Sequence, residues 1–134
     1  MIAVTGLYAG LLLLLAIALI LRVIDARRSE QVSLGDGDNE VLAVRIRGHA
    51  NLVENAPLFL IVLGVLEFNG ASPILLHFLG ILFLVSRILH AIGLSKPTGV
   101  GKYRYYGTLG TLIVMLAAAV YLVVQSLMGI NLHG

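Results

Sequence analysis

Polar and charged residues are concentrated on one apolar segment of the chain, where they could hold a charged ligand. Arg47, Asn51 and Glu54 are spaced i, i+4 and i+7, so a helix would place them within about 60° of one another. An ion at the centre of a bilayer costs roughly 2.5–3.5 kcal/mol, so such residues are kept where they pair or bind something. We expect this polar stripe (Arg47, Asn51 and Glu54) to point into a helix bundle or a subunit interface.

Two interpretations of the polar stripe remain open. In the first, Glu54 forms a structural ion pair with Arg47 or Arg87 and only stabilises the fold. In the second, the stripe binds a ligand. Arg45 and His49 form another i, i+4 pair on a neighbouring face, and we expect them to reach toward lipid headgroups.

Further cations occur at a matching depth on the other apolar segments. Arg22 ends the first segment, Arg104 opens the last, and Arg87 shares a helix face with His90 three residues later. About 20 helical residues cross a hydrocarbon core of ~30 Å. Counting from the outer ends of the segments then places these cations close to the level of the polar stripe. We therefore expect separate spans to bring polar groups to one layer.

Four apolar segments must position these residues. The chain has 134 residues, of which 59% are hydrophobic and 12% charged, and its mean hydropathy is +1.00. Lipid forces a backbone to satisfy its own hydrogen bonds, and the segments are too long and too few for barrel strands. The sequence therefore predicts an all-α membrane protein: one domain, residues 1–134, forming a four-transmembrane-helix bundle with helices over about 2–23, 41–68, 73–94 and 103–128.

The distribution of cations predicts the orientation of these spans. Lysine and arginine gather in the connection after the first segment and in the connection before the last, at Arg27, Arg28, Lys96 and Lys102. Cytoplasmic loops carry such an excess of positive charge. We therefore expect both termini to lie outside and the polar stripe to lie near the cytoplasmic face.

Several classes of function are disfavoured by what the sequence lacks. The chain contains no cysteine, so it has no disulfide, no thiolate metal site and no thiol nucleophile of its own. It also has no nucleotide-binding loop, zinc motif or nucleophile–histidine–acid signature. We expect no metal and no nucleic-acid partner.

Residues 47–57 resemble a family signature. They match the second-helix pattern R-x-H-x-N-x-x-E-x-x-P of the membrane-associated proteins in eicosanoid and glutathione metabolism (MAPEG), and residues 35–37, 67–70 and 87–93 add to the resemblance. This resemblance implies a four-helix bundle that assembles as a homotrimer. It further implies glutathione bound between neighbouring subunits at the cytoplasmic side, with lipophilic substrates arriving from the bilayer.

The resemblance also implies roles for particular residues. Glutathione carries two carboxylates and one ammonium, which arginines, an asparagine and a glutamate complement. Arg104 would be the catalytic residue, because a guanidinium beside the glutathione thiol lowers the thiol pKa and favours the nucleophilic thiolate. Glutathione itself would be held by six residues: Arg22, Arg47, Asn51, Glu54, Arg87 and His90.

The chain departs from the eicosanoid members at three positions. Thr108 and Leu94 stand where those enzymes carry tyrosines, and Ala50 stands where some carry an arginine. We therefore expect a compact bacterial-type member in a bacterial inner membrane, rather than a prostaglandin or leukotriene synthase. The predicted function is a glutathione transferase or peroxidase-like enzyme that acts on hydrophobic electrophiles or lipid hydroperoxides.

Two other functions are alternatives. A protein of the same fold could bind lipids and present them to partner enzymes without catalysis, and the three departures leave this open. A small transporter is less favoured, because the chain shows no inverted repeats or broken spans.

Overall fold

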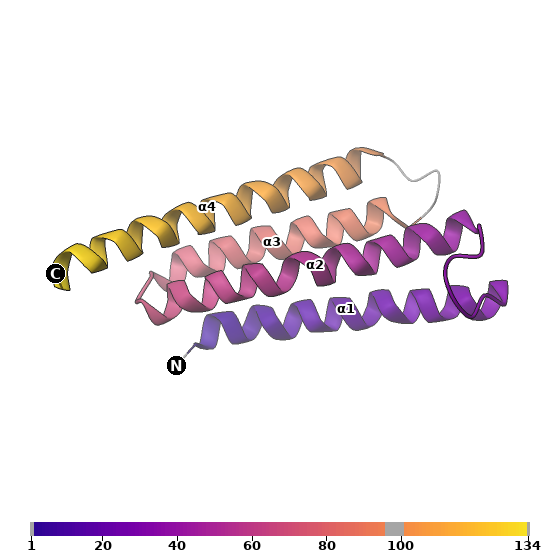
Figure 1. The fold of residues 1–134 in the computed structure, drawn as a ribbon, viewed down its shortest axis with the longest axis horizontal. Helices are drawn as coiled ribbons and strands as arrows, with labels where there is room; N and C mark the ends of the chain where they lie inside the picture. The colour runs from indigo at the N-terminus through magenta and orange to yellow at the C-terminus, as the bar shows by residue number, and fades with distance from the viewer. Residues whose placement is uncertain (1, 96–100, 134) are drawn as a thin grey trace.

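The computed structural model describes residues 2–95 and 101–133, with side chains described as far as Gly129. In these ranges the chain forms four antiparallel helices: α1 (Ala3–Glu30), α2 (Glu40–Phe68), α3 (Pro73–Gly93) and α4 (Gly101–His133) (Figure 1). Each helix is long and apolar enough to cross a membrane. The predicted all-α fold of four membrane-spanning helices is therefore confirmed.

The first helix is longer than the hydropathy pattern predicts. It was expected to end near residue 23, but α1 continues to Glu30, with Arg27 and Arg28 in its last turn. Cations are favourable there because the C-terminal end of a helix carries partial negative charge. The apolar run therefore ends before the helix does. The next helix starts at a polar cap, since the Asn39 side chain accepts a 2.9 Å hydrogen bond from the backbone N–H of Leu42.

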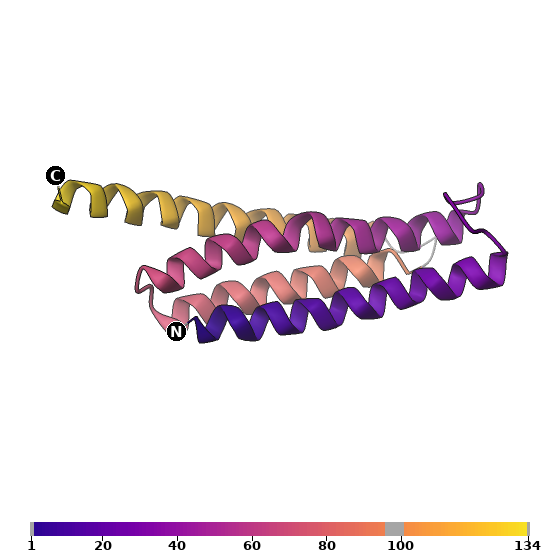
Figure 2. The same ribbon diagram turned by 60° about the horizontal axis from the view of Figure 1, so that its bottom comes forward.

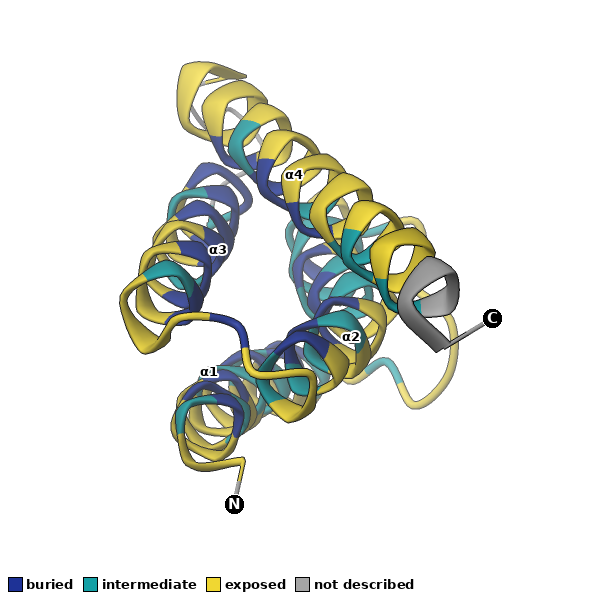
Figure 3. Cartoon of the chain, turned by 90° about the vertical axis from the view of Figure 1, so that its left-hand side faces the viewer, coloured by how far each residue is buried: buried dark blue, intermediate teal, exposed yellow. Residues whose placement is uncertain are grey.

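Apolar side chains fill the centre of the bundle. On α2 the buried residues Leu52, Phe59 and Leu63 recur at helical spacing, and Phe59 stacks on Phe83 of α3 with ring centroids 3.9 Å apart. Viewed along the helices, buried residues face inward and exposed ones cover the outside (Figure 3). Many of the exposed residues are leucine, isoleucine or valine, as a surface that faces lipid requires.

The helices do not all touch one another. Among the described residues, α4 packs against α3 and α2, and α1 packs against α2 and α3, without contact between α1 and α4. We call the end that holds the N-terminus and the α2–α3 connection the terminal end, and the opposite end, with the α1–α2 loop, the loop end. At the terminal end α4 extends past the other three helices (Figures 1 and 2).

Several polar side chains at the terminal end are paired within the chain. The Glu67 carboxylate accepts hydrogen bonds from the backbone N–H groups of Val4 (2.9 Å) and Thr5 (2.7 Å). These are orphan donors of the first turn of α1, whose own N-cap residue supplies no side-chain cap. The Tyr8 hydroxyl lies 3.0 Å from Nδ1 of His77 and donates to the His77 carbonyl at 3.1 Å. These contacts fasten α1 to α2 and α3.

The α2–α3 connection is tied to α4 at the same end. The Asn69 amide donates to the side-chain oxygen of Gln125, and the Gln125 amide donates to the Asn69 carbonyl, each at 3.2 Å. The polar groups of the terminal end are therefore used to hold helices together.

Candidate functional site

Glycines let α3 and α4 approach closely at the loop end. A Cβ atom placed on Gly107 would lie 2.5 Å from the backbone nitrogen of His90, and one placed on Gly93 would meet the backbone of Arg104. No hydrophobic force drives helices together in lipid, so they associate through close packing. Small residues permit that packing because they let two backbones approach. This glycine seam (Gly93 and Gly107) holds Arg104 against the end of α3.

Arg87 is buried at the centre of the loop-end half and joins three helices. Its side chain is 2% exposed. Nη1 donates to the side-chain oxygen of Asn51 on α2, and Nη2 donates to the carbonyl of Gly107 on α4 at 3.1 Å. Burying a guanidinium is costly unless its donors find acceptors. Both Nη atoms of Arg87 do so, whereas its buried Nε has no partner among the described residues. Arg87 therefore fixes the rotamer of Asn51 and reinforces the glycine seam.

A pocket of about 540 Å³ opens between α2, α3 and α4 above this buried guanidinium. We call it the three-helix pocket, and its volume lies in the range of small-molecule sites. It combines two guanidiniums, an amide and an imidazole with one aliphatic side chain and two hydroxyls. Its walls are formed by Arg47, Asn51, His90, Leu94, Gly101, Arg104, Tyr105 and Thr108.

A second cavity of about 570 Å³ adjoins the first and reaches the α1–α2 loop. Arg47, Leu94 and Arg104 line both cavities, so the two guanidiniums border both spaces. The loop side of the second cavity includes Arg27, whose Nη1 donates to the carbonyl of Gly35 at 2.8 Å. Arginine side chains at the loop end thus line the two cavities.

The polar stripe does contain an ion pair, and that pair is open to the surroundings. Nη1 of Arg47 lies 3.5 Å from Oε1 of Glu54, and the two side chains are 63% and 54% exposed. A long contact between two exposed groups contributes little stability. Glu54 does not line the three-helix pocket but stands on the exposed face of α2 beside it. Its structural partner is not Arg87, which is bonded to Asn51.

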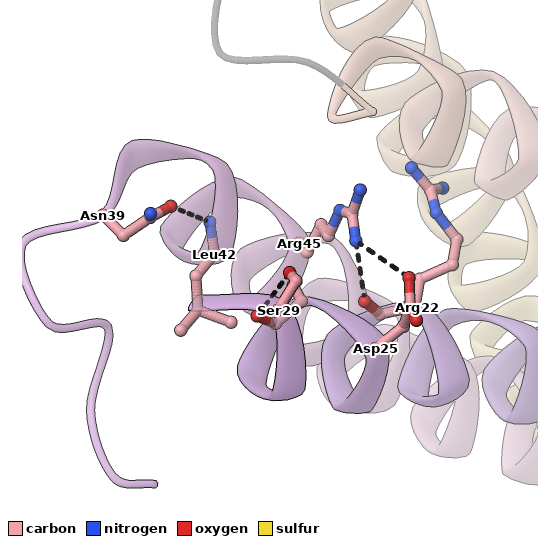
Figure 4. A network of polar contacts seen from close by, with 7 residues as sticks. Arg22, Asp25, Ser29, Asn39, Leu42 and Arg45 are labelled. Atoms are coloured by element: carbon pink, nitrogen blue, oxygen red, sulfur yellow. Dashed lines mark hydrogen bonds and ion pairs between the residues drawn. The ribbon is translucent and has the colours of Figure 1, made fainter. Parts of the chain in front are cut away.

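The predicted α1 residue lies apart from the rest of the site within one chain. Arg22 lines neither cavity described above. Its backbone carbonyl accepts a 3.1 Å hydrogen bond from Nη1 of Arg45, which also lies 3.9 Å from the Asp25 carboxylate. Figure 4 shows the Arg22 guanidinium pointing away from Asp25. Arg45, expected to reach toward headgroups, instead ties α2 to α1.

The structure thus brings together residues from three of the four helices. Arg47, Asn51, His90 and Arg104 line one pocket, Arg87 lies beneath it, and Glu54 stands at its side. Tyr105 was not among the predicted site residues, yet it lines the three-helix pocket together with Thr108. Tyr105 and Thr108 are spaced i, i+3, and this spacing could have predicted that they share one face of the helix.

Comparisons with known proteins agree with this architecture. The model of the MAPEG family matches residues 5–124. Two similar relatives are the "Inner membrane protein YecN" of Escherichia coli strain K12 and that of Escherichia coli O6:H1. Each is 36% identical over 90 residues, which cover 67% of this chain and 69% of the relative. With its four membrane-spanning helices and a match over nearly its whole length, the chain is an integral membrane protein that belongs to the MAPEG family.

Proposed function

We propose that this protein uses glutathione to attack hydrophobic electrophiles or to reduce lipid hydroperoxides. One observation carries the proposal: two exposed guanidiniums from different helices, Arg47 and Arg104, face one pocket together with the Asn51 amide. Guanidiniums are the strongest side-chain partners of carboxylates. The family includes glutathione transferases, which adds to this support.

The charges of the site complement those of glutathione. Arg47 and the Asn51 amide would hold a carboxylate, and Glu54, beside them on α2, would take the ammonium. His90 would contact the peptide from the floor of the pocket, while Arg87 would act by holding Asn51 in place. Since Glu54 and Arg47 are exposed in one chain, we further propose a homotrimer in which glutathione lies between subunits and Arg22 from the neighbouring α1 completes the site.

Arg104 would act on the sulfur. A guanidinium next to the thiol stabilises the thiolate, which is the nucleophile. The electrophile would enter from the bilayer, since exposed apolar residues such as Leu109 and Leu112 follow the pocket along α4. No metal is required for this chemistry.

Titration of glutathione into the detergent-solubilised protein tests the proposal most directly. We expect saturable heat at one site per chain, weakened at least tenfold in Arg47→Ala. Methyl esters of both glutathione carboxylates should bind poorly for the same electrostatic reason. Wild-type protein that releases no heat with glutathione and shows no turnover would overturn the proposal.

The proposed orientation has the pocket near the cytoplasmic face and both termini outside. The chain has no cysteine, so single cysteines introduced at Ser33 and Ser72 can be labelled without background. In intact inner-membrane vesicles of known sidedness, a membrane-impermeant maleimide should reach Ser33→Cys from the cytoplasmic side and Ser72→Cys from the other. The reverse pattern would refute the orientation.

Non-catalytic lipid binding is a second candidate, and one observation favours it. Two of the departures from the eicosanoid members, Leu94 and Thr108, lie on the wall of the three-helix pocket itself. An aliphatic side chain there makes the pocket more suitable for an acyl chain. Lipid that co-purifies with the protein and is not displaced by glutathione would favour this candidate.

A further inference from the structure

The three-helix pocket has two hydroxyl groups on its wall, and the structure treats them differently. The Thr108 hydroxyl donates its single proton to the backbone carbonyl of Arg104 at 2.9 Å. It can still accept a hydrogen bond, but its proton is already committed. Tyr105, in contrast, is 62% exposed and packs its ring edge-on against Tyr106, with centroids 5.4 Å apart. In the part of the chain that the structure describes, no hydrogen bond engages its phenol, so this hydroxyl can give a proton.

Arg104 and Tyr105 are consecutive residues that both line the pocket. A thiolate held by the Arg104 guanidinium would therefore have a proton donor on the same wall. His90 is the other group of the wall that could give a proton, but it is only 5% exposed and its backbone abuts Gly107. An exposed phenol can exchange protons with water between turnovers, whereas a buried imidazole does so less readily.

We infer that Tyr105 is the general acid of this protein and that its preferred electrophiles are those whose leaving atom is oxygen, such as epoxides. This inference rests on the proposed use of glutathione. It goes further because it assigns the second half of the reaction to a named residue and separates oxygen-leaving substrates from halide-leaving ones.

The step balances with the groups named. The thiolate electron pair forms the C–S bond, the C–O bond of the epoxide breaks, and its electron pair stays on oxygen. The Tyr105 O–H gives its proton to that oxygen, which leaves as an alcohol of the conjugate. The tyrosinate then takes a proton from water, replacing the proton that the glutathione thiol released. A halide leaving group needs no proton, so the same residue would be idle with a chlorinated aromatic substrate.

Comparing two substrates in one variant tests the inference. Tyr105→Phe keeps the ring and removes the hydroxyl. With glutathione and styrene oxide, we expect kcat to fall about 100-fold, the lower range of general acid catalysis. With glutathione and chlorodinitrobenzene, kcat should change less than about twofold on the same grounds, which also shows that the variant is folded. Tyr106→Phe is the matched control, since Tyr106 is 60% exposed and does not line the pocket.

The other outcomes each overturn a different statement. Equal losses with both substrates would mean that Tyr105 has only a structural role, and no loss with either would mean that it has none. A selective loss of epoxide turnover in His90→Gln with normal Tyr105→Phe would move the acid to His90. Wild-type protein that turns over neither substrate would remove the proposed function together with this inference, whereas turnover without selectivity would remove the inference alone.

Discussion

The two ends of the bundle satisfy their polar groups in opposite ways. At the terminal end, Glu67 accepts two backbone N–H groups, and Asn69 and Gln125 bond to each other. At the loop end, the guanidiniums of Arg47 and Arg104 border open cavities. Both ends bear the cost of polar groups in or near lipid. The terminal-end groups find partners within the chain. At the loop end Arg45 and Arg87 do the same, but Arg47 and Arg104 stay exposed beside the cavities.

The loop end is nevertheless rigid, and Gly107→Ala should show this with the largest effect. The added methyl group would meet the backbone of His90, so α3 and α4 would have to separate. We expect a loss of about 3 kcal/mol in unfolding free energy, the upper range for overpacking, and loss of glutathione binding. Gly6→Ala is the control, because a Cβ atom there meets nothing within 4 Å. If the two variants unfolded at the same temperature in detergent, close packing of α3 on α4 at the glycine seam would not be needed for stability.

Arg104→Ala should separate activity from stability. In the proposed mechanism the guanidinium stabilises the thiolate, so we expect kcat with chlorodinitrobenzene to fall about 100-fold, as for removal of one catalytic donor. The unfolding midpoint should stay unchanged, since the guanidinium is exposed and, among the described residues, forms no hydrogen bond or ion pair. Lys102→Ala removes a neighbouring cation that lies 5.6 Å from the Tyr103 ring and should leave kcat intact. An equal loss of kcat in both variants would mean that any nearby positive charge supports turnover, and that Arg104 has no special role.

Glu67→Ala should give the reverse result at the terminal end. It removes the cap of α1, and we expect a loss of about 1–2 kcal/mol in unfolding free energy. Glu67→Gln keeps an oxygen acceptor and should recover part of that loss. Glutathione affinity, measured by titration, should be the same in both variants as in the wild type. A weaker affinity would show that the two ends are coupled.

Gln125→Ala should have the smallest effect. It breaks the amide pair with Asn69, and side-chain hydrogen bonds in membrane proteins contribute about 0.6 kcal/mol on average. The change should appear as a slightly lower unfolding midpoint with unaltered turnover. A destabilisation as large as that of Glu67→Ala would mean that this pair anchors α4 more strongly than its two 3.2 Å contacts indicate.

Hydropathy and charge were sufficient to predict the four spans and which polar groups lie at one level along the bundle. Depth follows from counting residues along a helix, which is why Arg47, Asn51, His90 and Arg104 were expected together and line one pocket. Counting does not give the rotation of a helix about its axis. Arg22 has a suitable depth, but α1 does not contact α4 among the described residues, so within one chain it lies apart.

The partners of individual side chains could not be predicted from the sequence. Arg45 was expected to reach toward headgroups, yet it donates to the Arg22 carbonyl. Nothing in the sequence marked Glu67 as the cap of α1. Arg87 was expected to reach a ligand, but it is bonded to Asn51 and Gly107. Each of these contacts depends on which helices become neighbours and how closely they approach, and the glycine seam decides that only once α3 and α4 have packed.

The tyrosines beside the three-helix pocket also make the protein its own optical reporter. The chain has no tryptophan and five tyrosines, and three of these, Tyr103, Tyr105 and Tyr106, are exposed in the first turns of α4. Of these three, Tyr105 lines the pocket, and no indole emission masks its signal. Ligand binding in the three-helix pocket can then be followed by fluorescence quenching in unlabelled protein. Replacing each tyrosine in turn would show which ring the bound ligand quenches.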